Sequence, residues 1–139
     1  MVFRFRPALT DKVMPALMRS VFVPRGSWIL SGSLMGWGDA LIENVDAVVF
    51  LSVDRSIRME RLERREAVRY GEVDEAAQRA FFDWARGYDD PDFHGRSRVR
   101  HDRWLAALPC PVLPLDGADP VPRLVDSVTT WLDSPAVNG

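Results

Sequence analysis

Two groups of arginines carry the clearest chemical signal in this sequence. Of its 18 basic residues, all but Lys12 are arginine. A guanidinium group presents a planar fork of N–H donors that suits bidentate contact with phosphate oxygens. The first group is spaced i, i+3, i+7 and i+11, which places its members on one face of a helix. Together the groups indicate a polyphosphate clamp formed by Arg58, Arg61, Arg65 and Arg69 with Arg96, Arg98, Arg100 and Arg103.

Both observations also have a simpler interpretation. A stripe of like charges is typical of a solvated helix face, relieved here by pairing of Glu60 with Arg64 and of Glu66 with Arg69, each pair contributing about 0.3 kcal/mol. The preference for arginine over lysine is equally well explained by a codon bias. Spacing along the chain does not show that the two groups meet, so both interpretations stay open.

The other reactive side chains do not indicate a metal or hydrolase site. His94 and His101 have no partners at ligand spacing, and Cys110 stands between two prolines, which argues against zinc. Ser33 has no identifiable base, so a Ser/His/Asp hydrolase has no support. We expect His101, which lies on an apolar helix face, to be an interior histidine. We expect the acidic residues 89–92 to form a solvated loop.

The composition indicates one globular domain. The 139 residues are 47% hydrophobic and 27% charged, which excludes the disordered, fibrous and coiled-coil classes. The longest apolar run, Ala47 to Leu51, is far shorter than the roughly 18 residues that cross a bilayer. A net charge of −2 creates no field that would gather nucleic acid or anionic lipid. Since Cys110 cannot form an internal disulfide and no apolar signal segment follows the start, we expect a cytoplasmic protein without nucleic-acid or membrane partners.

Strands alternate with helices along the chain, which predicts an α/β fold with a mainly parallel sheet. Residues 46–53 contain a continuous apolar run that is typical of a strand covered on both faces. Residues 27–31 and 111–116 are the other predicted strands, and Pro114 places the last one at or near a sheet edge. Three short strands are few for such a sheet, so we expect the single domain 1–139 to be part of a larger fold. The helices are predicted at about 10–21, 56–70, 73–88, 101–108 and 120–132, with a short helical piece near 41–45.

Several segments resemble the adenylate-kinase-like P-loop NTPases. Residues 53–65, Val-Asp-Arg-Ser-Ile-Arg-Met-Glu-Arg-Leu-Glu-Arg-Arg after an apolar strand, look like the segment that leads into the lid of these kinases. Residues 112–121 resemble their last strand and its Asp-Gly-x-x-Pro-Val turn. The resemblance covers residues 24–132. It is closest to a group of small bacterial kinase-like ATPases, through Pro24-Arg25-Gly26-Ser27-Trp28, Gly36-Trp37-Gly38-Asp39, Tyr88-Asp89-Asp90, Arg96-Ser97-Arg98, His101 and Leu108-Pro109-Cys110-Pro111.

The resemblance implies a partial three-layer α/β/α P-loop fold with about three parallel strands and five helices, in which residues 66–95 form a lid-like helical insertion. It implies that Arg61 lies against the nucleotide base or ribose, that Arg65 contacts the phosphates, and that Gly117 and Ala118 form the turn bordering the base. One or two of Arg96, Arg98 and Arg100 would clamp phosphate. The loop that meets the phosphate acceptor would contain Ser31, Ser33, Gly36, Trp37, Gly38 and Asp39.

Two residues of this predicted acceptor loop have a second interpretation. Trp37 could stack on an acceptor ring, or it could be a half-buried anchor of the loop. Asp39 is better explained as a helix cap than as an acceptor ligand.

The sequence departs from the family at the P-loop. Family kinases carry a first strand and Gly-x-x-x-x-Gly-Lys-Ser/Thr, whose amides and lysine hold the phosphates while the hydroxyl helps to hold magnesium. The printed sequence has no such motif, and the family's first strand would lie between the predicted strands 27–31 and 46–53. We therefore expect the carboxyl-terminal portion of such a protein, truncated or degenerate. Its complete form would bind ATP and Mg²⁺ and transfer phosphate to a small nucleoside- or nucleotide-like acceptor. The alternative is a non-catalytic binding or assembly module completed by a partner or by homodimerisation.

Overall fold

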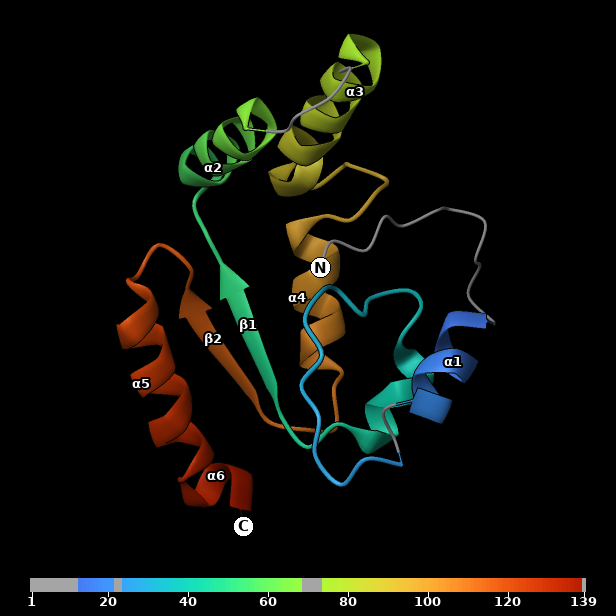
Figure 1. Cartoon of the computed structure of the whole chain (residues 1–139), viewed down its shortest axis with the longest axis vertical. Coiled ribbons are helices and arrows are strands. Elements are labelled where there is room, and N and C mark those ends of the chain that lie inside the picture. Colours follow the sequence, from blue (N-terminus) through green and yellow to red (C-terminus); the bar gives the residue numbers. More distant parts are fainter. Residues whose placement is uncertain (1–12, 22–23, 69–73, 139) are drawn as a thin grey trace. The chain divides into compact units, whose positions relative to one another are not determined.

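The computed structural model describes residues 13–21, 24–68 and 74–138. Its contacts divide the chain into two compact units, Met1–Asp46 and Ala47–Gly139. Figure 1 labels the helices and strands of both units. The predicted helix starts near Thr10 and at Val73, and the predicted phosphate ligand Arg69, lie outside the described residues.

The second unit contains a sheet of two parallel strands. β1 (Val48–Ser52) pairs with β2 (Val112–Asp116), in a register that sets Val48 opposite Val112 and Ser52 opposite Asp116. Both strands fall inside the predicted ranges. Pro114 lacks the N–H that a central strand would need, and the described sheet of two strands, both of them edges, is compatible with its predicted position.

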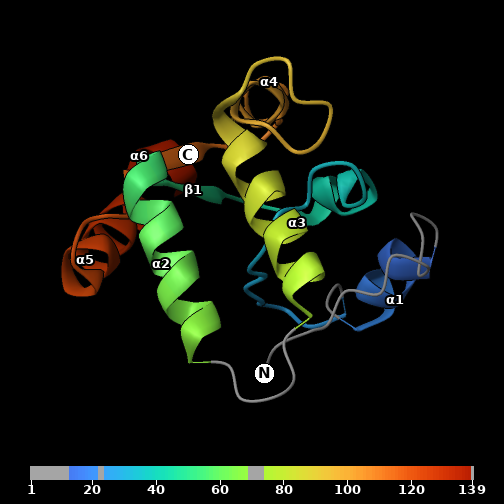
Figure 2. The same cartoon turned by 90° about the horizontal axis from the view of Figure 1, so that it is seen from above.

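Helices connect the two strands, as parallel pairing requires a crossover. They are α2 (Arg55–Ala67), α3 (Glu75–Arg86), the 3-10 turn η2 (Gly87–Asp89) and α4 (Arg98–Ala106), and α5 (Val121–Leu132) and α6 (Pro135–Asn138) follow β2. α2 and α3 lie side by side in the view of Figure 2 as well as in that of Figure 1. Capping side chains begin all three connecting helices, because Asp54, Asp74 and Ser97 each accept a hydrogen bond from an amide of the first turn.

Aromatic contacts join the sheet to α4. Phe50 of β1 stacks on His101 of α4, with ring centroids 6.2 Å apart, and Tyr88 of η2 faces the same histidine at 5.5 Å. On the connecting helices, Met59 of α2 and Ala85 of α3 are buried. His101 itself is 9% exposed, so it is the interior histidine that its helix face predicted.

The other face of β1 is open. Successive strand residues point to opposite faces, so Val49 and Leu51 lie opposite Phe50, and they are 38% and 56% exposed. α5 contacts β2, yet Val121 and Val125 of α5 are largely exposed. The described residues therefore leave apolar surface on the strand and the helix.

In the first unit, a short helix packs on a 3-10 helix. α1 (Val13–Val21) contacts η1 (Asp39–Asn44), and Leu41 and Ile42 of η1 are buried. Residues 27–31 do not form the predicted strand, because β1 and β2 are the only strands of the described chain and neither pairs with this segment. A strand needs backbone partners. The family's first strand, beside which this segment would lie, has no counterpart in the printed sequence.

Two parallel strands with helical connections agree with an α/β chain, and the P-loop relationship stays a prediction. Within residues 13–21, 24–68 and 74–138, no helix combines the length and apolar character that a membrane span requires.

Candidate functional site

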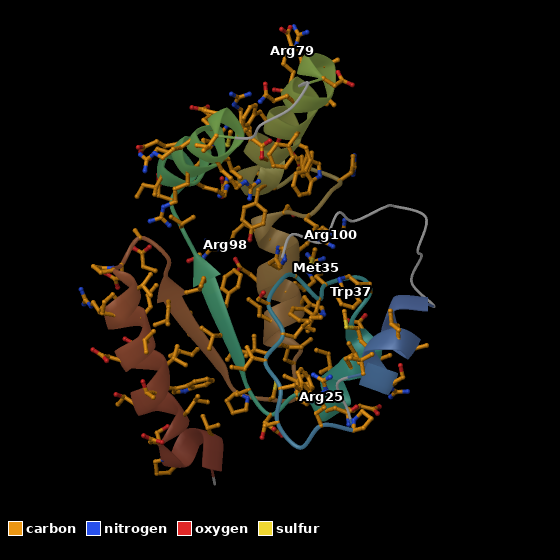
Figure 3. All side chains as sticks on the ribbon, in the orientation of Figure 1. Arg25, Met35, Trp37, Arg79, Arg98 and Arg100 are labelled. Atoms are coloured by element: carbon orange, nitrogen blue, oxygen red, sulfur yellow. The ribbon has the colours of Figure 1, made fainter. Side chains whose placement is uncertain are left out.

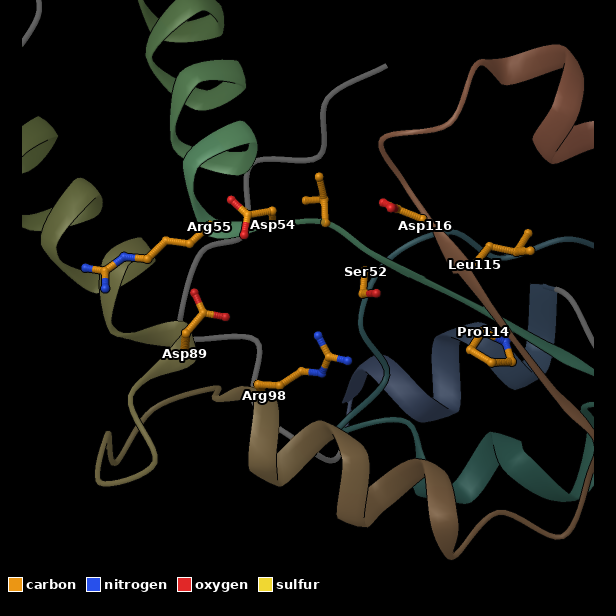
Figure 4. Close-up of a pocket in the computed structure, with 9 residues that line it drawn as sticks. Ser52, Asp54, Arg55, Asp89, Arg98, Pro114, Leu115 and Asp116 are labelled. Carbon is orange, nitrogen blue, oxygen red and sulfur yellow. The ribbon is translucent and has the colours of Figure 1, made fainter.

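A cleft opens where β1 and β2 end. It has a volume of about 600 Å³, and Figure 4 shows its walls. Ser52 and Asp116, the paired last residues of the two strands, form its floor. In α/β sheets, ligands bind outside the carboxyl ends of the strands, which makes this cleft the candidate site. Its lining consists of Ser52, Val53, Asp54, Arg55, Asp89, Arg98, Pro114, Leu115 and Asp116.

Arg98, the first residue of α4, points into this cleft (Figure 4). Its Nε donates to both carboxylate oxygens of Asp102 one helical turn later, at 3.1 and 3.2 Å. The guanidinium carbon lies 5.7 Å from the centre of the Phe50 ring. In the described structure only Nε has a hydrogen-bond partner, so the two terminal nitrogens are available to an anion in the cleft. Of the predicted arginines, Arg98 is the one that lines it.

Three carboxylates face the same cleft, and each has one oxygen engaged by the protein. Oδ1 of Asp54 accepts from the amide and the hydroxyl of Ser56, and the hydroxyl contact above all lowers the pKa of Asp54 below its ordinary value. Oδ1 of Asp116 accepts from the amide of Ala118 at 2.9 Å. Oδ2 of Asp89 faces Arg58 at 2.5 Å. The cleft therefore offers both anion-binding and hydroxyl-binding groups.

Arg61 and the turn after β2 meet in space. Nη1 of Arg61 donates to the carbonyl oxygen of Gly117 at 2.7 Å, across 56 positions of sequence. The amide of Gly117 donates to the carbonyl of Ser52 at 2.6 Å. A Cβ at position 117 would lie 3.2 Å from that same carbonyl oxygen, a tight contact that glycine avoids. Arg61, Gly117 and Ala118, three residues predicted to border the nucleotide, are thus brought together.

The other predicted phosphate ligands lie elsewhere in the second unit. Arg65 is exposed and pairs with the neighbouring Glu66 at 3.4 Å. Arg100 donates to the carbonyls of His94 and Gly95 at 2.7 and 3.1 Å, so it holds the preceding loop. In the view of Figure 3, Arg98 is labelled to the left of α4 and Arg100 to its right. Arg96 is half-buried and does not line the cleft.

The predicted acceptor loop belongs to the first unit. Trp37 is half-buried, and its ring N–H donates to the carbonyl of Ser33 at 2.8 Å, which fits the loop-anchor interpretation. The carbonyl of Leu34 accepts from the amides of Trp37 and Gly38, and Gly36 has a φ of 86°, which closes the turn. Gly38, not Asp39, occupies the cap position of η1, so the helix-cap prediction for Asp39 is wrong by one residue. Ser31 and Ser33 precede this turn, and Ser31 is exposed.

His101 is buried against the rings of Phe50 and Tyr88. Its Nδ1 lies 3.3 Å from the carbonyl of Ser97, and burial lowers the pKa of its imidazole below the ordinary value of 6.5. Burial likewise raises the pKa of Tyr88. Burial thus favours the neutral form of both rings.

The sequence did not predict that Arg58 and Asp89 form an ion pair. Asp89 was expected in a solvated loop, but it pairs with Arg58 from 31 positions away, and the side chains of Arg58 and Asp89 are only 19% and 34% exposed. The appearance of Tyr88-Asp89-Asp90 among the kinase-like fragments was the one available signal.

Comparison with other proteins finds a similar chain in Bacillus subtilis (strain 168), the uncharacterized protein YqaC. It is 42% identical over an alignment of 113 positions that covers 77% of this chain and 64% of the relative. This chain thus spans slightly less than two thirds of that relative's length. No model of a known protein family matches the chain, and no solved structure matches it.

Proposed function

We propose that this chain forms the nucleotide-binding portion of an adenylate-kinase-like P-loop protein. In its complete form the protein would bind ATP and transfer phosphate to a small nucleoside- or nucleotide-like acceptor in the cytoplasm, without nucleic-acid partners. The observation that carries the proposal is the cleft at the carboxyl ends of β1 and β2, into which Arg98 projects two terminal nitrogens that have no hydrogen-bond partner among the described residues. Charge-assisted contacts of this kind are the strong ones for phosphate.

The rest of the cleft supports a ligand that carries hydroxyls as well as phosphate. Asp54, Asp89 and Asp116 each keep one carboxylate oxygen without a protein hydrogen bond in the described structure, and ribose hydroxyls are suitable donors to such oxygens. Arg61 and the Gly117 turn lie together beyond the strand ends, as expected for a base-bordering element.

The described residues fit a nucleotide better than they fit its metal ion. No group of three or more metal-ligating side chains gathers within the described residues. The printed sequence also lacks the P-loop hydroxyl that holds Mg²⁺ in the family. When bound, Mg²⁺ supplies charge neutralisation between the phosphates. The role proposed for this chain is therefore to bind and orient, with Arg98 holding phosphate oxygens and Arg61 bordering the base.

Calorimetric titration of the 139-residue chain with MgATP tests the proposal. We expect measurable binding that Arg98→Gln weakens by about tenfold or more, because a hydrogen bond to a charged group contributes about 1.5–3 kcal/mol. Arg103→Gln is the matched control, since it removes the same charge from an exposed position of α4 outside the cleft. Absence of binding, or equal effects of the two substitutions, would overturn the proposal.

A turnover assay over nucleosides and nucleotides completes the test. Loss of the P-loop lysine and amides removes contacts that are each worth about 3 kcal/mol to the transition state. We therefore expect binding without robust phosphate transfer, and rapid turnover would contradict the truncated interpretation.

A non-catalytic assembly module is the second candidate, favoured by the open face of β1. Val49 and Leu51 are exposed on that face, where a partner could cover them. In the described sheet β1 also pairs with β2 alone, so its other edge can template further pairing. A stable dimer in light scattering, together with no nucleotide binding, would favour this function over the first.

A further inference from the structure

Arg58 lies behind the cleft in surroundings unlike those of the other arginines of α2. Its Nη2 lies 2.5 Å from Oδ2 of Asp89 and 3.4 Å from the carbonyl oxygen of Ala85. Its guanidinium carbon lies 4.9 Å from the centre of the Tyr88 ring. Its Nε is buried and has no hydrogen-bond partner in the described structure. Burying a guanidinium with an unsatisfied donor costs free energy, so packing alone does not explain an arginine at this position.

Asp89 connects Arg58 to the cleft. One oxygen of Asp89 faces Arg58, and the residue lines the cleft close to Arg98 (Figure 4). Carboxylates outnumber guanidiniums in the lining of the cleft, and Arg98 is itself paired with Asp102, so the lining has a negative charge that repels an entering anion. Arg58 supplies a further guanidinium next to Asp89 and reduces this negative charge. The lining charges are those of Asp54, Asp89 and Asp116 and of Arg55 and Arg98.

We propose that Arg58 is a positioning residue that neutralises and orients Asp89, so that the cleft accepts a phosphate-bearing anion. The inference rests on the proposed function in taking the ligand to be a phosphate compound. Arg58 does not touch the ligand. It acts through Asp89, which lines the cleft while one of its carboxylate oxygens is held by Arg58.

Four variants of the 139-residue chain test the inference by calorimetric titration with MgATP. We expect Arg58→Gln to weaken binding by about tenfold, because it leaves the Asp89 carboxylate uncompensated beside the anion. The double variant Arg58→Gln with Asp89→Asn should recover affinity to within about threefold of the wild type, since the unpaired charge is gone. Arg58→Lys should also keep affinity within about threefold while lowering the melting temperature, because lysine keeps the charge but neither the planar fork nor the stacking on Tyr88. Arg64→Gln is the control, as Arg64 pairs with Glu60 on the exposed face of the same helix.

The recovery in the double variant separates a role in charge balance from a structural one. If Arg58 served only to hold the fold, the double variant would bind at least as weakly as Arg58→Gln, and the inference would be overturned. An Arg58→Gln affinity equal to that of the wild type would overturn it as well.

Inorganic tripolyphosphate as a second probe distinguishes failure of the inference from failure of the proposed function. If the wild type binds tripolyphosphate but not MgATP, and Arg58→Gln weakens that binding, the inference stands and the nucleotide function falls. If the wild type binds neither probe, the cleft is no anion site and both are overturned.

Discussion

The contact between Arg61 and Gly117 predicts how firmly the turn after β2 is held. The side chain spans from α2 to a backbone carbonyl at the end of the neighbouring β2 segment, with an N···O distance of 2.7 Å. Replacing Arg61 by Gln shortens the side chain and removes its charge, so this cross-link is lost. In the described structure the turn then keeps the hydrogen bond from Gly117 to Ser52 of β1 and the local ones from Ala118 and Asp119 to Asp116.

The size of the effect follows from the exposure of the contact. A hydrogen bond to a charged donor contributes about 1.5–3 kcal/mol when buried, and solvent exposure reduces that to about 1 kcal/mol here. A loss of about 1 kcal/mol raises the open population of the turn about fivefold. The rest of the second unit should stay as stable as before, because α2 remains anchored by Met59 and Arg58.

Native-state amide exchange measures this opening directly. We expect the amides of Ala118 and Asp119 to exchange about fivefold faster in Arg61→Gln than in the wild type, while the amides of β1 are unchanged. Arg64→Gln, on the exposed face of the same helix, controls for the loss of charge. Unchanged exchange at the turn, or equal acceleration in the control, would show that Arg61 does not hold Gly117.

Three further outcomes are expected. Met59→Ala should lower the free energy of unfolding by about 2–3 kcal/mol, measured by urea denaturation, because Met59 is the buried residue of α2 and its removal leaves a cavity. Since burial lowers the pKa of His101 in the folded state, the unfolded chain binds more protons just below pH 6.5, and stability should fall as the pH drops from 6.5 toward the folded pKa. Melting curves should lose this dependence in His101→Gln but keep it in the exposed-site variant His94→Gln. Gly38→Ala should destabilise the first unit by about 1–3 kcal/mol in the same denaturation assay, because its Cβ would lie 2.7 Å from that of Leu34, and an unchanged midpoint would contradict the described turn.

Local elements were predictable because their signals are local. The apolar run before Asp54 and the stripe that includes Phe81 and Trp84 predict β1 and α3 to within a few residues, since burial and helical periodicity act over one or two turns. The strand predicted at 27–31 was wrong because strand formation also depends on a distant partner, which a local pattern does not encode. Its five residues have strand composition, but a strand is stabilised by a neighbour, and the described chain offers it none.

The candidate site was predictable only in part. Spacing correctly indicates that Arg58, Arg61 and Arg65 share a side of one helix, yet each has a different partner, namely Asp89, Gly117 and Glu66. Helical spacing carries no information on which distant segment packs against which turn. The Arg58 pair in particular depends on how α3 returns along α2, which no local pattern encodes.

Pro114 makes the two borders of the sheet chemically unequal. Val48 donates to Pro111 and Ser52 accepts from Gly117, so in this register the alternate residues of β2 that bond to β1 are Leu113 and Leu115. The ring nitrogen of Pro114 therefore faces the outer edge of β2, where it has no N–H to donate to a further strand. The border along β1 has no such block, since Val49 and Leu51 keep complete peptide groups. A further strand could therefore pair along β1, whereas Pro114 disfavours pairing along the outer edge of β2.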